Sequence, residues 1–250
     1  MLHQAPALAL ALLIGVLLGA MGSGGSIVTV PVLVYVAGIA PGSAVPMSMA
    51  IVGTTSLLAA FLHGRRGNFH PKAALLLGVS GAVGAYFGSS GTHLVSAQTL
   101  MLIFAVLLLV VGVVMFRGGA GGLPPGVCRP VRCLAIGAVV GLLTGFLGVG
   151  GGFLIVPALV LFAGLDTKSA IGTSLAIIAL NSAAGLAGQL RYATLNWSLT
   201  GSLTVLALAG MLVGLALSER VSEESTRKAF ASLLIVVSVV IAGITLRALP

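Results

Sequence analysis

Apolar residues in this chain occur in ten runs, and the charged residues stand at the boundaries between them. The runs occupy residues 6–22, 26–38, 43–62, 72–90, 97–116, 133–148, 152–164, 169–190, 198–217 and 227–248. A helix needs about 20 apolar residues to cross the hydrocarbon core of a bilayer. Most of the runs come close to this length, which predicts an all-α polytopic membrane protein. The runs 26–38 and 152–164 are shorter and are expected to be half-helices.

Each of the two short runs follows a dense group of glycines, and the two groups lie 126 positions apart. Gly15, Gly19, Gly22, Gly24, Gly25 and Pro31 align without a gap on Gly141, Gly145, Gly148, Gly150, Gly151 and Pro157. The same offset pairs Gly38 with Gly164, Ser48 with Ser174, Ser56 with Ser182, Gly84 with Gly210 and Gly88 with Gly214. The chain is therefore predicted to contain two homologous transmembrane repeats, 1–117 and 133–250, joined by a cytoplasmic linker, 118–132.

Composition supports the membrane assignment and limits the partners. The chain is 58% hydrophobic and 6% charged, far outside the range of a soluble domain. Its net charge of +8 is spread singly through short loops, where it meets lipid headgroups rather than nucleic acid. We expect a multi-pass protein of the cytoplasmic membrane, with no metal and no cofactor. Cys128 and Cys133 are expected to be reduced thiols, and the four histidines to be solvated.

A helix that runs into glycines and resumes before a proline is typical of a helix broken inside the bilayer. If the chain passes straight through each glycine group, the halves are parallel and the basic residues divide eight against four across the membrane. If it doubles back, the halves are inverted and the division becomes ten against two. Because cytoplasmic loops are enriched in Lys and Arg, we favour inverted repeats, each with a glycine-broken helix hairpin plus three spanning helices.

The glycine groups are candidate anion sites. Free N–H groups at a helix start, together with the positive end of the helix dipole, bind anions without a cationic side chain. The candidate substrate-binding residues are Gly22, Ser23, Gly24, Gly25 and Ser26 in the first group and Gly148, Gly150, Gly151 and Gly152 in the second. The alternative is close helix packing. We expect packing for the outlying glycines at positions 15, 19, 84, 88, 141, 145, 210 and 214.

Polar residues in the helix after each glycine group are the second set of candidates. Thr54, Thr55, Asn181 and Ser182 lie in apolar surroundings that penalise unpartnered polar groups. We expect these four side chains to donate hydrogen bonds to the cargo. Hydrogen bonding between helices is an equal alternative.

The doubled glycine element, the serine-bearing helix after it and the repeat over the whole length resemble the sulfite exporter TauE/SafE family of membrane permeases. This resemblance implies transport of sulfite, organosulfonates or related anions across the cytoplasmic membrane of a prokaryote. No Asp or Glu lies within a span, so carboxylate proton relays are missing and efflux is favoured over coupled uptake.

Two other functions stay open. One is an intramembrane hydrolase with Ser23 as nucleophile, although the chain is expected not to be an enzyme. The other is a coupled importer of another small organic anion. The expected partners are the small anionic substrate and the lipid bilayer. A homodimer is common among such transporters, but no residue argues for one.

Overall fold

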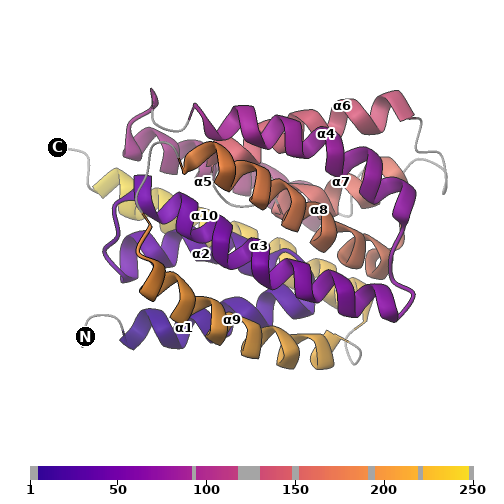
Figure 1. Cartoon of the computed structure of the whole chain (residues 1–250), viewed down its shortest axis with the longest axis horizontal. Helices are drawn as coiled ribbons and strands as arrows, with labels where there is room; N and C mark the ends of the chain where they lie inside the picture. Colours follow the sequence, from indigo (N-terminus) through magenta and orange to yellow (C-terminus); the bar gives the residue numbers. More distant parts are fainter. Residues whose placement is uncertain are drawn as a thin grey trace.

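The computed structural model describes residues 5–91, 94–117, 130–147, 152–190, 195–218 and 222–247, and all regular structure within them is helical. The helices are α1 Ala5–Met21, α2 Gly24–Pro31 with the π-helical continuation η2 Val32–Val36, α3 Pro41–Arg65, α4 Pro71–Ser89, α5 Ala97–Phe116, α6 Pro130–Leu147, α7 Gly152–Ala163, α8 Thr167–Gln189, α9 Trp197–Ser218 and α10 Glu223–Arg247. Each of the ten predicted apolar runs thus corresponds to one helix. Figure 1 shows the helices packed side by side along one main direction.

Six helices of the described residues are long and apolar enough to cross a membrane, namely α3, α5, α6, α8, α9 and α10. The three spanning helices expected in each half correspond to α3, α4 and α5 and to α8, α9 and α10. The observed set contains α6 in place of α4. The reason is composition, because Lys72 at the start of α4 and the glycines and serines along it lower its mean hydropathy. Shorter apolar helices cover 8–21 and 24–36, so α1 and α2 are the pieces of a broken element.

The chain reverses direction between α1 and α2. A methyl group on Gly25 would lie 2.7 Å from the Cβ atom of Leu18 and would overlap the carbonyl oxygen of Ile14. Farther along α2, Val32 packs in one apolar cluster with Ile14. Residues later in α2 therefore meet residues earlier in α1, which is the geometry of a helical hairpin. The doubling-back that the charge distribution favoured is present at the first glycine group.

The half-helices end in the same way. Gly38 follows η2 with φ +66°, and Gly164 follows α7 with φ +64°, a left-handed conformation that glycine adopts without strain. In each case the next N–H group bonds back into the helix, from Ile39 to the Leu33 oxygen at 2.9 Å and from Leu165 to the Leu159 oxygen at 3.2 Å. These residues are again 126 positions apart.

Glycines form two close helix contacts, which confirms the packing role predicted for them. Along α1 and α9, a methyl group on Gly15, Gly19, Gly210 or Gly214 would overlap the backbone of the facing helix. Along α4 and α6, the same holds for Gly84, Gly88, Gly141 and Gly145. Close backbone approach of this kind is what small residues provide in membrane helix pairs. We call these two contacts the glycine seams.

Charged residues gather at one end of the molecule, which we call the basic end. Helices α3 and α9 both end there. Arg66, which caps the end of α3, donates from Nη1 to the Leu215 oxygen of α9 at 3.3 Å. There too α5 finishes and α10 starts, with Arg227 Nη1 donating to the Met115 oxygen at 2.9 Å. At the opposite end η2 meets the end of α10, where the Tyr35 and Thr245 hydroxyl oxygens lie 2.9 Å apart. In Figure 1, α1 begins and α10 ends at this opposite end, on the left.

Helix α8 also starts at the basic end, capped by Asp166. The carboxylate Oδ2 accepts the N–H group of Ser169 at 3.0 Å. Burial alone would raise the pKa of the Asp166 carboxyl, but the hydrogen bonds from Ser169 outweigh it and hold the pKa below its ordinary value. Asp166 is therefore a structural cap of the kind expected at a helix start.

One expectation about the cysteines is wrong. Cys133 is disulfide-bonded, whereas a reduced thiol was predicted from the lack of a second cysteine pair. Cys128 lies outside the described residues.

Candidate functional site

Orphaned polar groups mark one region of the interior. Within the described residues, the buried side-chain nitrogen and oxygen atoms without a hydrogen-bond partner belong to Ser23, Ser56, His63, Asn181 and Ser182. Such groups are rare in folded proteins, and each calls for an explanation such as water or a bound ion. All five lie in the first glycine group, α3 or α8. No other described element contributes one.

The first glycine group is a tight, fully buried turn. Gly22 has φ +73°, so a side chain there would be strained. Ser23 occupies the N-cap position of α2, yet its hydroxyl makes no capping hydrogen bond. The Ser26 hydroxyl donates instead to the Ser23 carbonyl oxygen at 2.7 Å. The start of α2 thus lacks the side-chain cap that its N-cap serine could supply.

Gly152, the one described residue of the second glycine group, lies against the first group. A methyl group on Gly152 would lie 2.6 Å from the Cβ atom of Ser23 and 2.7 Å from the Oγ atom of Ser26. Gly152 and Ser26 occupy equivalent positions in the 126-residue offset. Gly148, Gly150 and Gly151, the other candidates of the second group, lie outside the described residues.

The glycines of the first group differ in their contacts. Gly25 is packed against α1, as described above, whereas a methyl group on Gly24 would lie 3.3 Å from the nearest atom, the Leu17 oxygen. Gly22 contacts α8 instead, because a methyl group there would lie 2.7 Å from the Ile171 Cγ2 atom. Gly25 therefore has a packing role, and the backbone of Gly24 is less tightly enclosed.

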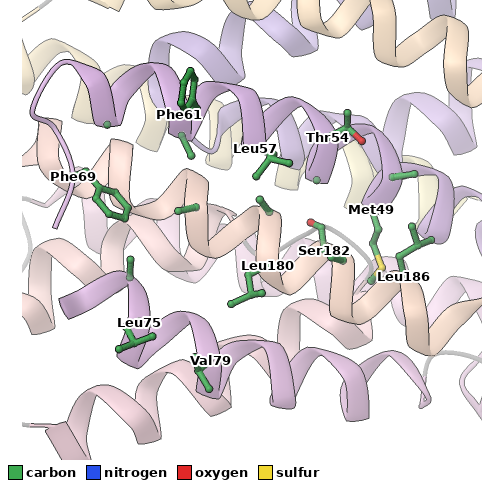
Figure 2. A pocket seen from close by; sticks show the side chains of 18 of the residues that line it. Met49, Thr54, Leu57, Phe61, Phe69, Leu75, Val79, Leu180, Ser182 and Leu186 are labelled. Atoms are coloured by element: carbon green, nitrogen blue, oxygen red, sulfur yellow. The ribbon is translucent and has the colours of Figure 1, made fainter. Parts of the chain in front are cut away.

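A wide groove of about 1190 Å³, open to the surface of the molecule, runs between α3, α4 and α8; Leu57 and Leu75 on its wall are each 65% exposed. Thr54 and Ser182, two of the predicted donors, line it, while most of its wall is apolar. Figure 2 shows Thr54 and Leu57 along α3, with Leu180 and Ser182 on the facing α8. Ser182 also packs on α3, since a methyl group on Gly53 would lie 2.9 Å from its Cβ atom.

The remaining predicted donors point elsewhere. The Thr55 hydroxyl donates to the Ile51 oxygen of its own helix at 2.6 Å, which satisfies it locally. The Asn181 amide lies against α4, where a methyl group on Gly81 would be 2.8 Å from its Oδ1 atom. The structure thus brings Ser182 and Thr54 to the groove, places Asn181 between helices and leaves the glycine turn buried away from the groove.

Two residues were missed by the sequence reasoning. Ser56 is the counterpart of Ser182 in the 126-residue offset, and both hydroxyls are buried without a partner. His63 was expected to be solvated because it stands near a helix end, and this is wrong, because its side chain is only 4% exposed. The signal that could have predicted burial of His63 is the 126-residue offset, which aligns His63 with Gln189 inside the apolar run 169–190.

A small cavity lies next to the first turn at the basic end. Its volume is about 20 Å³, enough for one water molecule. Met21, which immediately precedes the turn, lines it together with Ile171 and Arg227. Met21 and Arg227 thus line one cavity, which places the start of the turn near the basic end.

Comparison with known proteins identifies the family. The model of the family "Sulfite exporter TauE/SafE" matches residues 7–241. A "Probable membrane transporter protein" of Xylella fastidiosa strain Temecula1 is 34% identical over 222 residues, covering 84% of this chain and 83% of the relative. The probable membrane transporter protein YdhB of Bacillus subtilis is 26% identical over 208 residues, covering 81% of this chain and 85% of the relative. No solved structure matches.

The family match spans both glycine groups, both polar helices and both glycine seams. The Xylella relative is similar over more than four-fifths of either chain. The described spans and the relatives agree on a multi-pass membrane protein. This chain belongs to the sulfite exporter TauE/SafE family of membrane transporters.

Proposed function

We propose that the protein is a secondary transporter that exports small sulfur-containing oxyanions, such as sulfite or organosulfonates, across the cytoplasmic membrane. The cargo binds between the glycine-rich turns and the polar residues of α3 and α8. The observation that carries this proposal is the confinement of the orphaned buried polar groups to those elements. Intramembrane polar groups commonly mark substrate pathways.

An oxyanion fits these groups chemically. Serine hydroxyls, the Asn181 amide and the N–H groups at the start of α2 are all hydrogen-bond donors, and none carries a fixed negative charge. Each unpartnered group costs about 1 to 3 kcal/mol in the interior. An anion with several acceptor oxygens that reached them would recover that cost. The proposed site residues are therefore the predicted ones without Gly25, which packs on α1, and without Thr55, which bonds within α3, and with Ser56 added.

The proposed architecture is two inverted repeats, 1–117 and 133–250, around the linker 118–132. Three observations support it: the hairpin at the first glycine group, the matched caps at Gly38 and Gly164, and the exchanged glycine seams. In the seams, α1 of the first half packs on α9 of the second, and α6 of the second packs on α4 of the first. This exchange is expected of halves related by a two-fold axis.

The basic end is proposed to face the cytoplasm. Of the Lys and Arg residues that the structure describes, eight lie at the basic end: Arg65, Arg66, Lys72, Arg117, Arg132, Lys168, Arg227 and Lys228. Arg247 lies at the opposite end. The positive-inside rule then orients the molecule. The disulfide at Cys133 argues the other way, because disulfides are typical of oxidising compartments.

Cysteine labelling tests this orientation. In a protein whose two cysteines are replaced by alanine, we expect Ser222→Cys at the basic end to be protected from a membrane-impermeant maleimide in intact cells. Ser198→Cys at the opposite end should react. Both positions are exposed, so accessibility in the folded protein is not limiting. Reaction of Ser222→Cys and protection of Ser198→Cys would reverse the orientation.

Efflux follows from the energetics. An inside-negative potential favours anion exit by about 2.3 kcal/mol per charge per 100 mV, so export needs no coupling ion. A coupled importer of another organic anion would need one. The hydrolase alternative gains no support at Ser23, because its Oγ atom contacts no hydrogen-bond partner and a serine nucleophile needs a bonded base.

Flux measurements test the proposal. Purified protein in liposomes is expected to give saturable flux of radiolabelled sulfite or ethanesulfonate above that of protein-free liposomes. The control is the same preparation after thermal unfolding. Flux equal to that of protein-free liposomes for both anions would overturn the proposed function.

A further inference from the structure

His63 is the one titratable side chain among the orphaned groups. It lies in the last turn of α3 at the basic end, and 4% of its surface is exposed. Neither ring nitrogen has a hydrogen-bond partner. An imidazole always carries at least one N–H donor, so burial of His63 without a hydrogen-bond partner is costly. An apolar side chain could fill the same space without that cost.

The position of His63 places it beside the first glycine turn. Its ring approaches the backbone of Gly19, three residues before the turn, without reaching hydrogen-bond geometry. A methyl group on Gly172 would lie 3.1 Å from the His63 Cβ atom, and the preceding residue, Ile171, contacts Gly22 of the turn. His63 and the turn therefore share the same two neighbouring helices, α1 and α8.

The equivalent place in the other half is satisfied. Gln189 stands 126 positions after His63, is equally buried, and donates from Nε2 to the Ser89 carbonyl oxygen at 2.9 Å. A buried polar residue at this position can thus find a backbone partner. The histidine, at the end proposed to face the cytoplasm, has none.

We propose that His63 is a cargo-binding residue that loads the oxyanion onto the first glycine turn from the basic end. The inference rests on the proposed function. The ring donates an N–H hydrogen bond to the anion. When doubly protonated it also supplies the positive charge that the site otherwise lacks. A buried imidazolium is stable only when paired, so the cation and the bound anion stabilise each other.

The surroundings leave His63 as the titratable group at this place. Helices α1 and α9 contain no titratable side chain within their described bounds, and the start of α8 contributes its N-cap Asp166 and, in the first turn, Lys168. Arg66, three residues along the chain, acts on His63 electrostatically and is engaged with the Leu215 oxygen. His70 and Lys72, at the start of α4, are exposed.

The test compares His63→Gln with His70→Gln. Glutamine keeps a donor and matches the residue of the other half, so the variant is expected to fold. His70 is an exposed N-cap whose Nδ1 atom accepts the Ala73 N–H group at 3.3 Å, and it serves as the control. We expect the sulfite concentration that gives half-maximal thermal stabilisation to rise roughly ten-fold or more in His63→Gln, and to stay unchanged in His70→Gln.

A pH profile supplies a readout that a structural role would not move. Between about pH 5 and pH 8, acidification on the basic-end side should lower the KM of sulfite flux in the wild type, and acidification on the other side should not. This difference should disappear in His63→Gln. Protonation of sulfite itself affects both proteins equally, so the comparison isolates the histidine.

The outcomes separate the two claims. If the wild type neither binds nor moves sulfite, the proposed function fails and the inference with it. If the wild type binds sulfite but His63→Gln binds it equally well with the same pH profile, only the inference is overturned. If His63→Gln does not fold, the wild-type pH profile decides, and a profile independent of side overturns the inference.

Discussion

Replacing Ser182 by alanine is expected to stabilise the protein and at the same time to slow anion flux. The Ser182 hydroxyl is buried without a partner, so its removal should relieve about 1 to 3 kcal/mol of desolvation penalty. The same hydroxyl is a proposed donor to the anion. Losing one hydrogen bond to a charged group costs roughly 1.5 to 3 kcal/mol, so transport at low substrate should fall at least ten-fold. Thermal unfolding and sulfite flux on one preparation measure both effects.

Ser174 is the matched control on the same helix. It is equally buried, but its hydroxyl donates to the Ile171 oxygen at 2.7 Å. Ser174→Ala should therefore leave flux unchanged and give little or no gain in stability. Destabilisation by Ser182→Ala with full flux would assign Ser182 to packing and remove it from the site.

Leucine at a seam glycine is expected to abolish folding in the membrane. A side chain at Gly141 would overlap the backbone of Gly81 in the facing helix. Backbone cannot rotate away as a side chain can, so α4 and α6 would have to separate. Overpacking alone costs about 1 to 3 kcal/mol, and separating two whole helices should exceed that range. The monodisperse fraction of detergent-solubilised protein in size-exclusion chromatography measures the outcome.

Gly201 and Gly243 provide the control for the seam. Both lie in membrane helices, and a methyl group on either would contact nothing within 4 Å. Gly201→Leu and Gly243→Leu should therefore yield folded protein at the wild-type level. Gly15→Leu in the other seam should fail as Gly141→Leu does, because the two seams are equivalent. Normal yield from both seam variants would contradict the packing described here.

Much of the fold could be predicted from local pattern. The apolar runs define the helices, and the glycine group with its following proline marks the broken helix, because both are properties of short segments. The packing role of the seam glycines was predictable because small residues four apart form a stripe on one helix face. The 126-residue offset linked the halves without any structural information.

The pairing of polar groups could not be predicted, because it depends on contacts between distant segments. Thr55 bonds to the carbonyl oxygen four residues earlier, whereas Ser56, the next residue, finds no partner. His63 is buried because the start of α8 packs over the end of α3 at Gly172. Nothing in the sequence around His63 indicates that contact.

The turn and the groove are not contiguous in this conformation. The first glycine group is buried, while Thr54 and Ser182 line the wide open groove. A transporter of the alternating-access type opens its site to one side at a time, so a buried turn is consistent with the proposal. The proposed site then consists of two separate parts, the glycine turn and the groove with Thr54 and Ser182, and the anion has to contact both.

Equilibrium binding of radiolabelled sulfite to the purified protein tests the central claim most directly. The comparison is between two double variants, Ser23→Ala with Ser182→Ala, and Ser48→Ala with Ser174→Ala. The second pair is buried like the first, but its hydroxyls already bond to carbonyl oxygens, at 2.9 Å for Ser48 and 2.7 Å for Ser174. We predict saturable binding by the wild type and the second double variant, and its loss in the first. Equal binding by both double variants, or no saturable binding by the wild type, would contradict the account.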